Sequence, residues 1–159
     1  MTNAKPKEYF IHFLPRVTYM NREEIAKENF MSGMNCAQAV VAAFSDLLGK
    51  DAKALVNAAL SFGGGLGRQG ELCGTVSGMS MVAGALYGEG ASKGVHYAFI
   101  RELCDRFREE TGSIVCRELL GQVSKNAFGQ ELDVKKRPCA DLCALAAKIL
   151  SEAIEQKQG

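Results

Sequence analysis

The sequence SKGVHYAFIRELCDRFREETGS, residues 92–113, decides the fold class. Its large apolar residues recur every four positions, at Val95, Phe99, Leu103 and Phe107. This spacing predicts an amphipathic helix, because residues three and four positions apart share one face of an α-helix. Ser92 can cap the start of that helix, and Gly112 can end it.

The same helical pattern extends outward over most of the chain, and no stretch alternates apolar and polar residues over the length of a strand. Three polar residues can cap further helices: Asn21, Asn35 and Asp51. Helices are predicted within 21–33, 36–48, 51–62, 73–87, 92–111, 113–121 and from Pro138 onward. The polar residues 122–137 predict a solvated loop. We therefore expect an all-α fold, a compact helical bundle of about seven helices.

Length and composition exclude several classes of protein. The 159 residues are 47% apolar and 23% charged, which is typical of one globular domain. We assign that domain to residues 21–159 and treat residues 1–20 as an N-terminal extension. A net charge of +1 gives no basic excess for binding nucleic acid. The longest uncharged run, 72–88, is short and rich in glycine, so no membrane insertion is expected.

The six cysteines raise the question of disulfides. The first residues show no secretory signal, and the chain is long enough to build an apolar core without crosslinks. We therefore expect a cytoplasmic, reduced protein, in which clustered cysteines more often bind metal or carry out redox chemistry. No Cys-x-x-Cys pair is present in the sequence, so any site must be assembled from distant segments.

Four cysteines fall at the starts of four predicted helices: Cys36, Cys73, Cys116 and Cys139. The positive end of a helix favours a thiolate, which is the form that binds metal. The alternative is that these cysteines are small buried hydrophobic residues. Cys104 lies in the middle of a helix and Cys143 one turn after Cys139, and both are interpreted as packing residues. Cys143 is close enough to Cys139 to be a spare ligand or a resolving thiol.

Many of the 17 glycines surround Cys73. Residues 65–70 match the G-x-G-x-x-G pattern of dinucleotide-binding proteins, but that site requires a preceding strand, and a helical pattern precedes it here. Gly74 and Gly78 lie one turn apart, so their helix can let another backbone or a compact cluster approach closely. Tight helix packing alone is the open alternative.

Five segments resemble the redox-active C-GCAxxG-C-C family. They are Asn35–Val40, Phe62–Arg68, Gly70–Gly78, Gly112–Gly121 and the late Cys139. The resemblance runs from about residue 24 to residue 152, and the four cysteines and the glycine loop fall in register with the family pattern. The element Cys73–Gly78 departs from the pattern in carrying a hydroxyl at Thr75.

The resemblance implies a function for the four cysteines at the helix starts. They match the family's hallmark cysteines, and the family is similar to the non-haem part of split-Soret cytochromes c, where such cysteines hold an iron–sulfur cluster. This implies a 2Fe-2S cluster for electron transfer, bound by Cys36, Cys73, Cys116 and Cys139. The Gly74 amide and the Thr75 hydroxyl are candidate donors to its sulfurs.

Two other functions remain open for the same cysteines, namely metal-free thiol–disulfide redox activity and a structural zinc site. No Ser/His/Asp or Cys/His arrangement is visible, so a redox-accessory role is favoured over a stand-alone enzyme. The expected partner is an unidentified redox protein. A homodimer is a further expectation, in which the segment Tyr9–Ile11 covers a neighbouring subunit.

Overall fold

Helix α2 (Arg22–Met31) begins where the Asn21 side chain accepts a hydrogen bond from the Glu24 amide, as the sequence predicts. The structure is a computed structural model that describes residues 21–121 and 138–159. The predicted N-terminal extension, with its dimer segment Tyr9–Ile11, and the predicted loop 122–137 lie outside the described residues.

Residues 36–48 form two helices, α3 (Cys36–Ala42) and α4 (Ser45–Leu48), so the prediction of one continuous helix is wrong. The start of α3 is a capping box, in which the Asn35 side chain accepts from the Gln38 amide and the Gln38 side chain accepts from the Asn35 amide. The break has two physical causes. Phe44 leaves the helical conformation and its side chain becomes fully buried, while the Ser45 hydroxyl donates to the Ala42 carbonyl.

Helix α5 (Ala52–Ala59) lies between two short 3-10 turns, Gly49–Asp51 and Leu60–Phe62. Asp51 makes no capping hydrogen bond through its side chain, so its predicted capping role is wrong. The reason is that Asp51 already has helical dihedral angles, φ −84° and ψ −12°, as the last residue of a 3-10 turn. A capping side chain normally extends from a residue in the β region.

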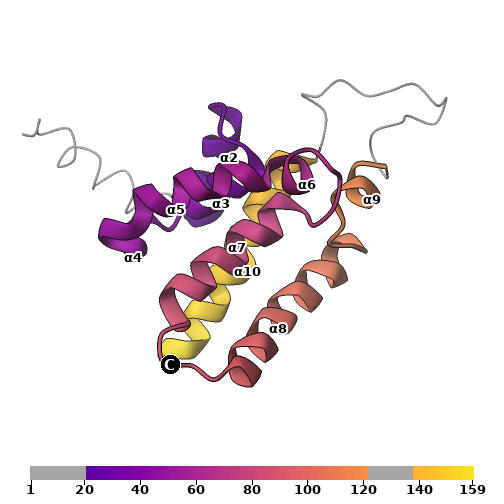
Figure 1. The fold of residues 1–159 in the computed structure, drawn as a ribbon. Coiled ribbons are helices and arrows are strands. Elements are labelled where there is room, and N and C mark those ends of the chain that lie inside the picture. Colours follow the sequence, from indigo (N-terminus) through magenta and orange to yellow (C-terminus); the bar gives the residue numbers. More distant parts are fainter. Residues whose placement is uncertain (1–20, 122–137) are drawn as a thin grey trace, which may run out of the picture.

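The remaining elements are α6 (Gly63–Leu66), α7 (Gly74–Tyr87), α8 (Lys93–Thr111), α9 (Cys116–Gly121) and α10 (Cys139–Gln158). Helices α7 and α10 run together through the middle of the molecule (Figure 1). Helices α2 and α3 pack on α10 at one end, and α8 lies along the α7–α10 pair. The starts of α7, α9 and α10 therefore lie at one end of the molecule, near α6.

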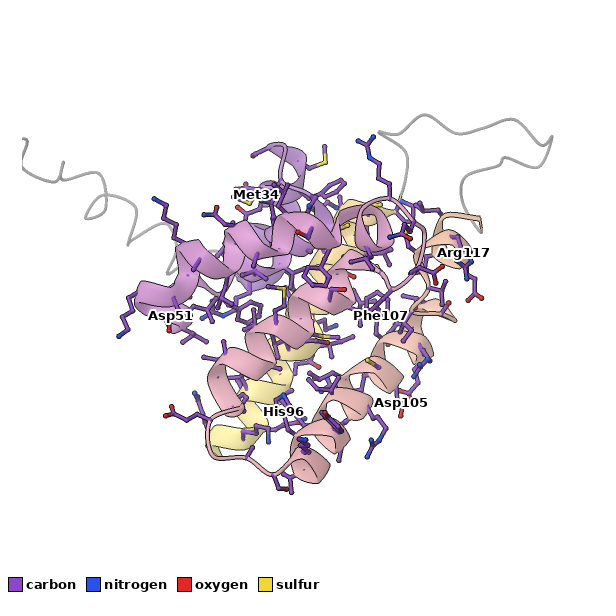
Figure 2. The ribbon with its side chains drawn as sticks, viewed as in Figure 1. Met34, Asp51, His96, Asp105, Phe107 and Arg117 are labelled. Atoms are coloured by element: carbon purple, nitrogen blue, oxygen red, sulfur yellow. The ribbon has the colours of Figure 1, made fainter. Side chains whose placement is uncertain are left out.

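The apolar face of α8 is narrower than the sequence predicts. Phe107 and Leu103 are fully buried and Phe99 is 8% exposed, but Val95 is 69% exposed. Each step of four residues exceeds one helical turn by about 40°. Three such steps separate Val95 from Phe107, so the Val95 side chain points in a different direction around the helix axis. Figure 2 shows Phe107 pointing between the helices and Asp105 pointing outward from the same helix.

The all-α prediction is confirmed, and all seven predicted helical segments are helical in the part of the chain that the structure describes. Within that part, the β structure consists of one isolated bridge, between Leu72 and Val115. One apolar cluster extends through these helices, as expected for a single domain. None of the described helices is both long and apolar enough to span a membrane.

Candidate functional site

The four cysteines predicted at helix starts do lie there. Cys36, Cys116 and Cys139 are the first residues of α3, α9 and α10, and Cys73 is the N-cap residue of α7. Side-chain caps precede Cys36, at Asn35, and Cys116, at Ser113, whereas the helices that start at Cys73 and Cys139 have no side-chain cap. The sequence pattern nevertheless predicted a helix start at each cysteine.

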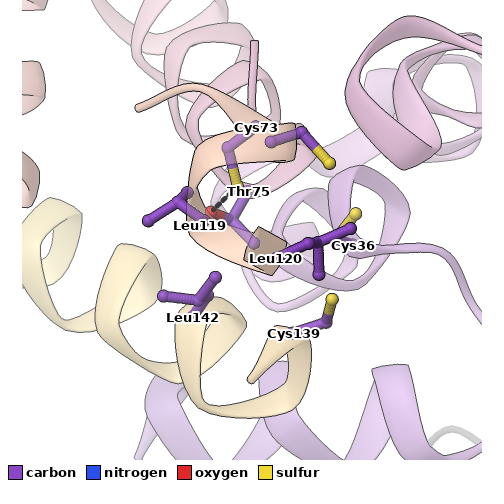
Figure 3. A pocket seen from close by; sticks show the side chains of 8 residues that line it. Cys36, Cys73, Thr75, Leu119, Leu120, Cys139 and Leu142 are labelled. Carbon is purple, nitrogen blue, oxygen red and sulfur yellow. Dashed lines mark hydrogen bonds between the residues drawn. The ribbon is translucent and has the colours of Figure 1, made fainter. Parts of the chain in front are cut away.

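The fold brings these four cysteines to one small cavity (Figure 3). Its volume is about 20 Å³, and its wall is completed by Thr75, Leu119, Leu120 and Leu142. Cys36, Cys73 and Cys116 are buried, whereas Cys139 is partly exposed. The cavity thus gathers five of the six residues predicted for the site.

Gly74, the sixth predicted residue, lies directly behind Cys36. A Cβ atom at Gly74 would lie 2.7 Å from the Cys36 Sγ and 2.9 Å from the Phe62 carbonyl oxygen. At Gly78, one turn later, a Cβ would lie 2.7 Å from the Ala37 carbonyl oxygen. Both glycines therefore let α7 pack closely on neighbouring segments, and Gly74 does so beside a cysteine sulfur; the approach of a cluster stays a prediction.

Sequence reasoning missed the contact that brings Cys73 to Cys116. The Cys73 amide donates to the Ile114 carbonyl at 2.8 Å, and the Cys116 amide donates to the Glu71 carbonyl at 2.6 Å. These bonds flank the bridge between Leu72 and Val115. The pairing is too short to give an alternating pattern, so the β-branched pair Ile114-Val115 is the only local signal in the sequence.

The glycine loop before Cys73 is shaped by the same contact. Gly65 has φ +69°, in the left-handed region, and a Cβ there would lie 2.6 Å from the Cys116 Cβ. The exposed side chains of Arg117 and Glu71 form an ion pair at 2.7 Å on the outside of this loop. The loop can approach α9 this closely because residue 65 has no side chain.

Burial controls the protonation of the Cys73 thiol. It raises the pKa of Cys73, while the Thr75 hydroxyl at 3.1 Å and the amides of Thr75 and Val76 act in the opposite direction. The amides at this helix start thus favour the thiolate of Cys73, as expected, but burial has the larger effect on its pKa. The fully buried Thr75 hydroxyl is the polar group closest to this sulfur among the contacts described.

The two other cysteines differ from each other. Cys104 is half-buried on α8 and packs against the apolar core, in agreement with its predicted packing role. Cys143 is fully buried on α10, and its thiol donates to the Cys36 carbonyl at 3.7 Å. Cys143 therefore lies beside a cavity-lining cysteine although it is not part of the cavity wall.

The donor atoms at the cavity fit a metal that prefers sulfur. Four cysteines from four helices line the cavity, and thiolates select zinc, copper(I) and iron–sulfur clusters. Within residues 21–121 and 138–159, however, no group of three or more Cys, His, Asp or Glu side chains is arranged to hold a metal ion. The cysteine side chains would have to turn toward a common centre to bind one.

Comparisons with known proteins support the same cysteine pattern. A family model described as "Putative redox-active protein (C_GCAxxG_C_C)" matches residues 34–153. Searches of the curated proteins and of the solved structures find no match. The matched span contains all six cysteines and extends from the cap of α3 into α10. Because it covers most of the chain, the protein belongs to the redox-active C_GCAxxG_C_C family.

Proposed function

We propose that the protein is an electron-transfer module in which Cys36, Cys73, Cys116 and Cys139 bind a 2Fe-2S cluster. One observation carries the proposal, namely that four cysteines from four separate helices line a single buried cavity. A bound cluster of this kind supplies one-electron chemistry whose potential depends on its surroundings. All-cysteine ligation is a common arrangement for such clusters.

The residues around the cavity would control solvent access and potential. Leu119, Leu120 and Leu142 form an apolar wall that keeps water away from the sulfurs. The Thr75 hydroxyl can donate to the Cys73 sulfur, and a donor at this position stabilises the added negative charge of a reduced site. Thr75 would therefore raise the reduction potential relative to an apolar residue.

A structural zinc site is the second candidate, and the size of the cavity favours it. A volume of about 20 Å³ holds about one water molecule, and one ion needs less space than a cluster. Four cysteine sulfurs also match the closed tetrahedral site of structural zinc. Metal-free thiol–disulfide exchange receives less support, because the raised pKa of Cys73 reduces the thiolate fraction at neutral pH.

The proposal includes a cellular context. Thiols that must remain reduced to bind metal suit a reducing compartment such as the cytoplasm. Electron transfer needs a redox partner protein, which would dock where the partly exposed Cys139 reaches the surface. We also propose that the protein forms a homodimer, which a measurement of its molecular mass in solution tests.

The test is to purify the protein without oxygen and measure its iron, acid-labile sulfide, zinc and visible absorption. We expect equal amounts of iron and sulfide, and loss of both in Cys73→Ala. Cys104→Ala is the matched control, because it removes a cysteine outside the cavity, and it should retain the iron. Protein that stays free of iron after reconstitution would rule out the cluster, and zinc alone would support the second candidate.

A further inference from the structure

Cys143 is a fully buried cysteine beside the candidate site that the proposed function does not use. It lies one helical turn after Cys139, so the two side chains share a face of α10. Its thiol donates to the backbone carbonyl of Cys36, the first residue of α3, with an Sγ–O distance of 3.7 Å. The Cys143 sulfur is therefore held close to the residue that begins α3.

From this placement we propose that Cys143 is a reserve ligand that takes the coordination position of Cys36 when Cys36 is removed or displaced. The inference rests on the proposed function, since it requires metal at the four-cysteine cavity. It concerns Cys36 because the Cys143 thiol bonds to the Cys36 backbone, whereas Cys139 is partly exposed.

Burial supports a reserve role rather than a permanent one. Cys143 is fully buried in the apolar core and does not line the cavity, so its sulfur is not one of the four that would bind the metal in the wild-type protein. Of the four helices that begin at the cavity, only α10 carries a further cysteine, which is Cys143.

The exchange is balanced without any oxidant or reductant. The bond between the metal and the Cys36 sulfur breaks, and the released thiolate takes up a proton. The bond between the metal and the Cys143 sulfur forms, and the Cys143 thiol releases a proton. In a Cys36→Ala variant only the second half occurs, and the proton passes to solvent. The number of sulfur ligands stays the same.

The experiment uses Co²⁺ as the probe, added to the full reduced chain without oxygen. Thiolate-to-cobalt absorption reports how many sulfurs bind, and a titration gives the affinity. We compare wild type, Cys36→Ala, Cys143→Ala and the double variant Cys36→Ala/Cys143→Ala. Cys73→Ala is the matched control, because it removes a cavity cysteine that has no reserve.

We expect Cys143→Ala to bind Co²⁺ like wild type and Cys36→Ala to keep the charge-transfer intensity of four thiolates. The double variant should lose part of that intensity and bind more than about tenfold more weakly than Cys36→Ala. Cys73→Ala should lose part of that intensity although Cys143 is present. Circular dichroism checks the fold, and Cys143→Val, which fills more of the space, replaces Cys143→Ala if the latter unfolds.

Two results overturn the inference, and they are distinguishable. If Cys36→Ala and the double variant bind Co²⁺ with equal affinity and equal intensity, Cys143 is not a reserve ligand, although the four-cysteine site stands. If wild type binds neither Co²⁺ nor iron, the proposed function fails and the reserve role fails with it.

Discussion

The two ends of helix α10, the yellow helix of Figure 1, have different surroundings. Its first turns carry Cys139 and Cys143, beside a small cavity lined by cysteines from three other elements. Near its last turn, the Lys157 Nζ lies 4.2 Å from the centroid of the Phe99 ring and 5.2 Å from that of Tyr87. The two rings meet edge to face, with centroids 5.7 Å apart.

The difference indicates that residues at one end of a helix can contribute to the stability of the fold while residues at the other end contribute to metal binding. At the C-terminal end, Lys157 lies over two aromatic rings, and burial of such rings stabilises the fold. At the N-terminal end, the cavity of about 20 Å³ is lined by cysteines, whose thiols can bind metal. We therefore expect changes at the C-terminal end to affect the free energy of unfolding, and changes at the N-terminal end to affect metal binding.

The largest expected effect is on stability, from Phe99→Ala at the C-terminal end. Loss of this buried ring should lower the free energy of unfolding by about 3 kcal/mol or more, measured by urea denaturation. Co²⁺ affinity of the folded fraction should not change. Cys73→Ala should show the opposite pattern, with a smaller loss of stability and loss of metal. If Phe99→Ala weakened Co²⁺ binding as strongly as Cys73→Ala, the expectation that only the N-terminal end of α10 affects metal binding would be wrong.

Gly74→Ala should have the next largest effect, at the site end. The new methyl group would lie 2.7 Å from the Cys36 Sγ and 2.9 Å from a backbone oxygen, so α3 and α7 must move apart. We expect a loss of about 1–3 kcal/mol in stability together with weaker Co²⁺ binding.

The matched control for Gly74→Ala is Gly94→Ala in the first turn of α8, where no atom lies within 4 Å of the added Cβ. It should be neutral or stabilising by up to about 1 kcal/mol, since alanine favours the helix. Equal effects of the two substitutions, measured by thermal unfolding, would contradict the close approach at Gly74.

Thr75→Val should have a smaller effect, confined to the Cys73 thiol. Removing the hydroxyl takes away a group that lowers the pKa of Cys73, so that pKa should rise further. Metal binding releases the thiol proton, and the pH at which Co²⁺ binds should therefore move upward. The cost in binding should be about 1 kcal/mol, measured by Co²⁺ titrations from pH 6 to 9. Thr75→Ser, which keeps the hydroxyl, should behave like wild type.

The smallest expected effect is that of Asp46→Asn, on α4, where Asp46 lines a pocket together with Ile154 and Gln158 of α10. The hydrogen bond from Arg22 lowers the pKa of Asp46 below its ordinary value of 3.8. The stability that this adds is fully present above the unfolded pKa and is lost as the pH falls through the lower, folded pKa. Because the pair is partly exposed, the loss at pH 7 should be below about 1 kcal/mol.

Urea denaturation at pH 7 and pH 3 checks the prediction for Asp46→Asn. The difference in stability between wild type and Asp46→Asn should be smaller at pH 3, and metal binding at pH 7 should be unchanged. A difference that grows toward pH 3 would contradict the sign of this pKa shift.

Much of the local structure could be predicted from the sequence, and the errors have two kinds of cause. The capping side chains of Asn21, Asn35 and Ser92 act within a few residues, so their effect is visible in the sequence. The break after α3 depends on burial of Phe44, and burial requires neighbours that are distant along the chain. The exposure of Val95 follows instead from the rotation that accumulates over steps of four residues along a helix.

The candidate site likewise has features that the sequence predicts and features that depend on tertiary contacts. The sequence by itself determined that four cysteines begin four helices, because capping and turn residues act locally. Only the tertiary structure decided that these four share a cavity, through the bridge between Leu72 and Val115 and the close approach of α7 to Cys36 at Gly74. It also decided that Cys143 lies beside Cys36. The physical reason is that contacts between separate helices depend on which surfaces bury one another, and spacing along one chain does not record that.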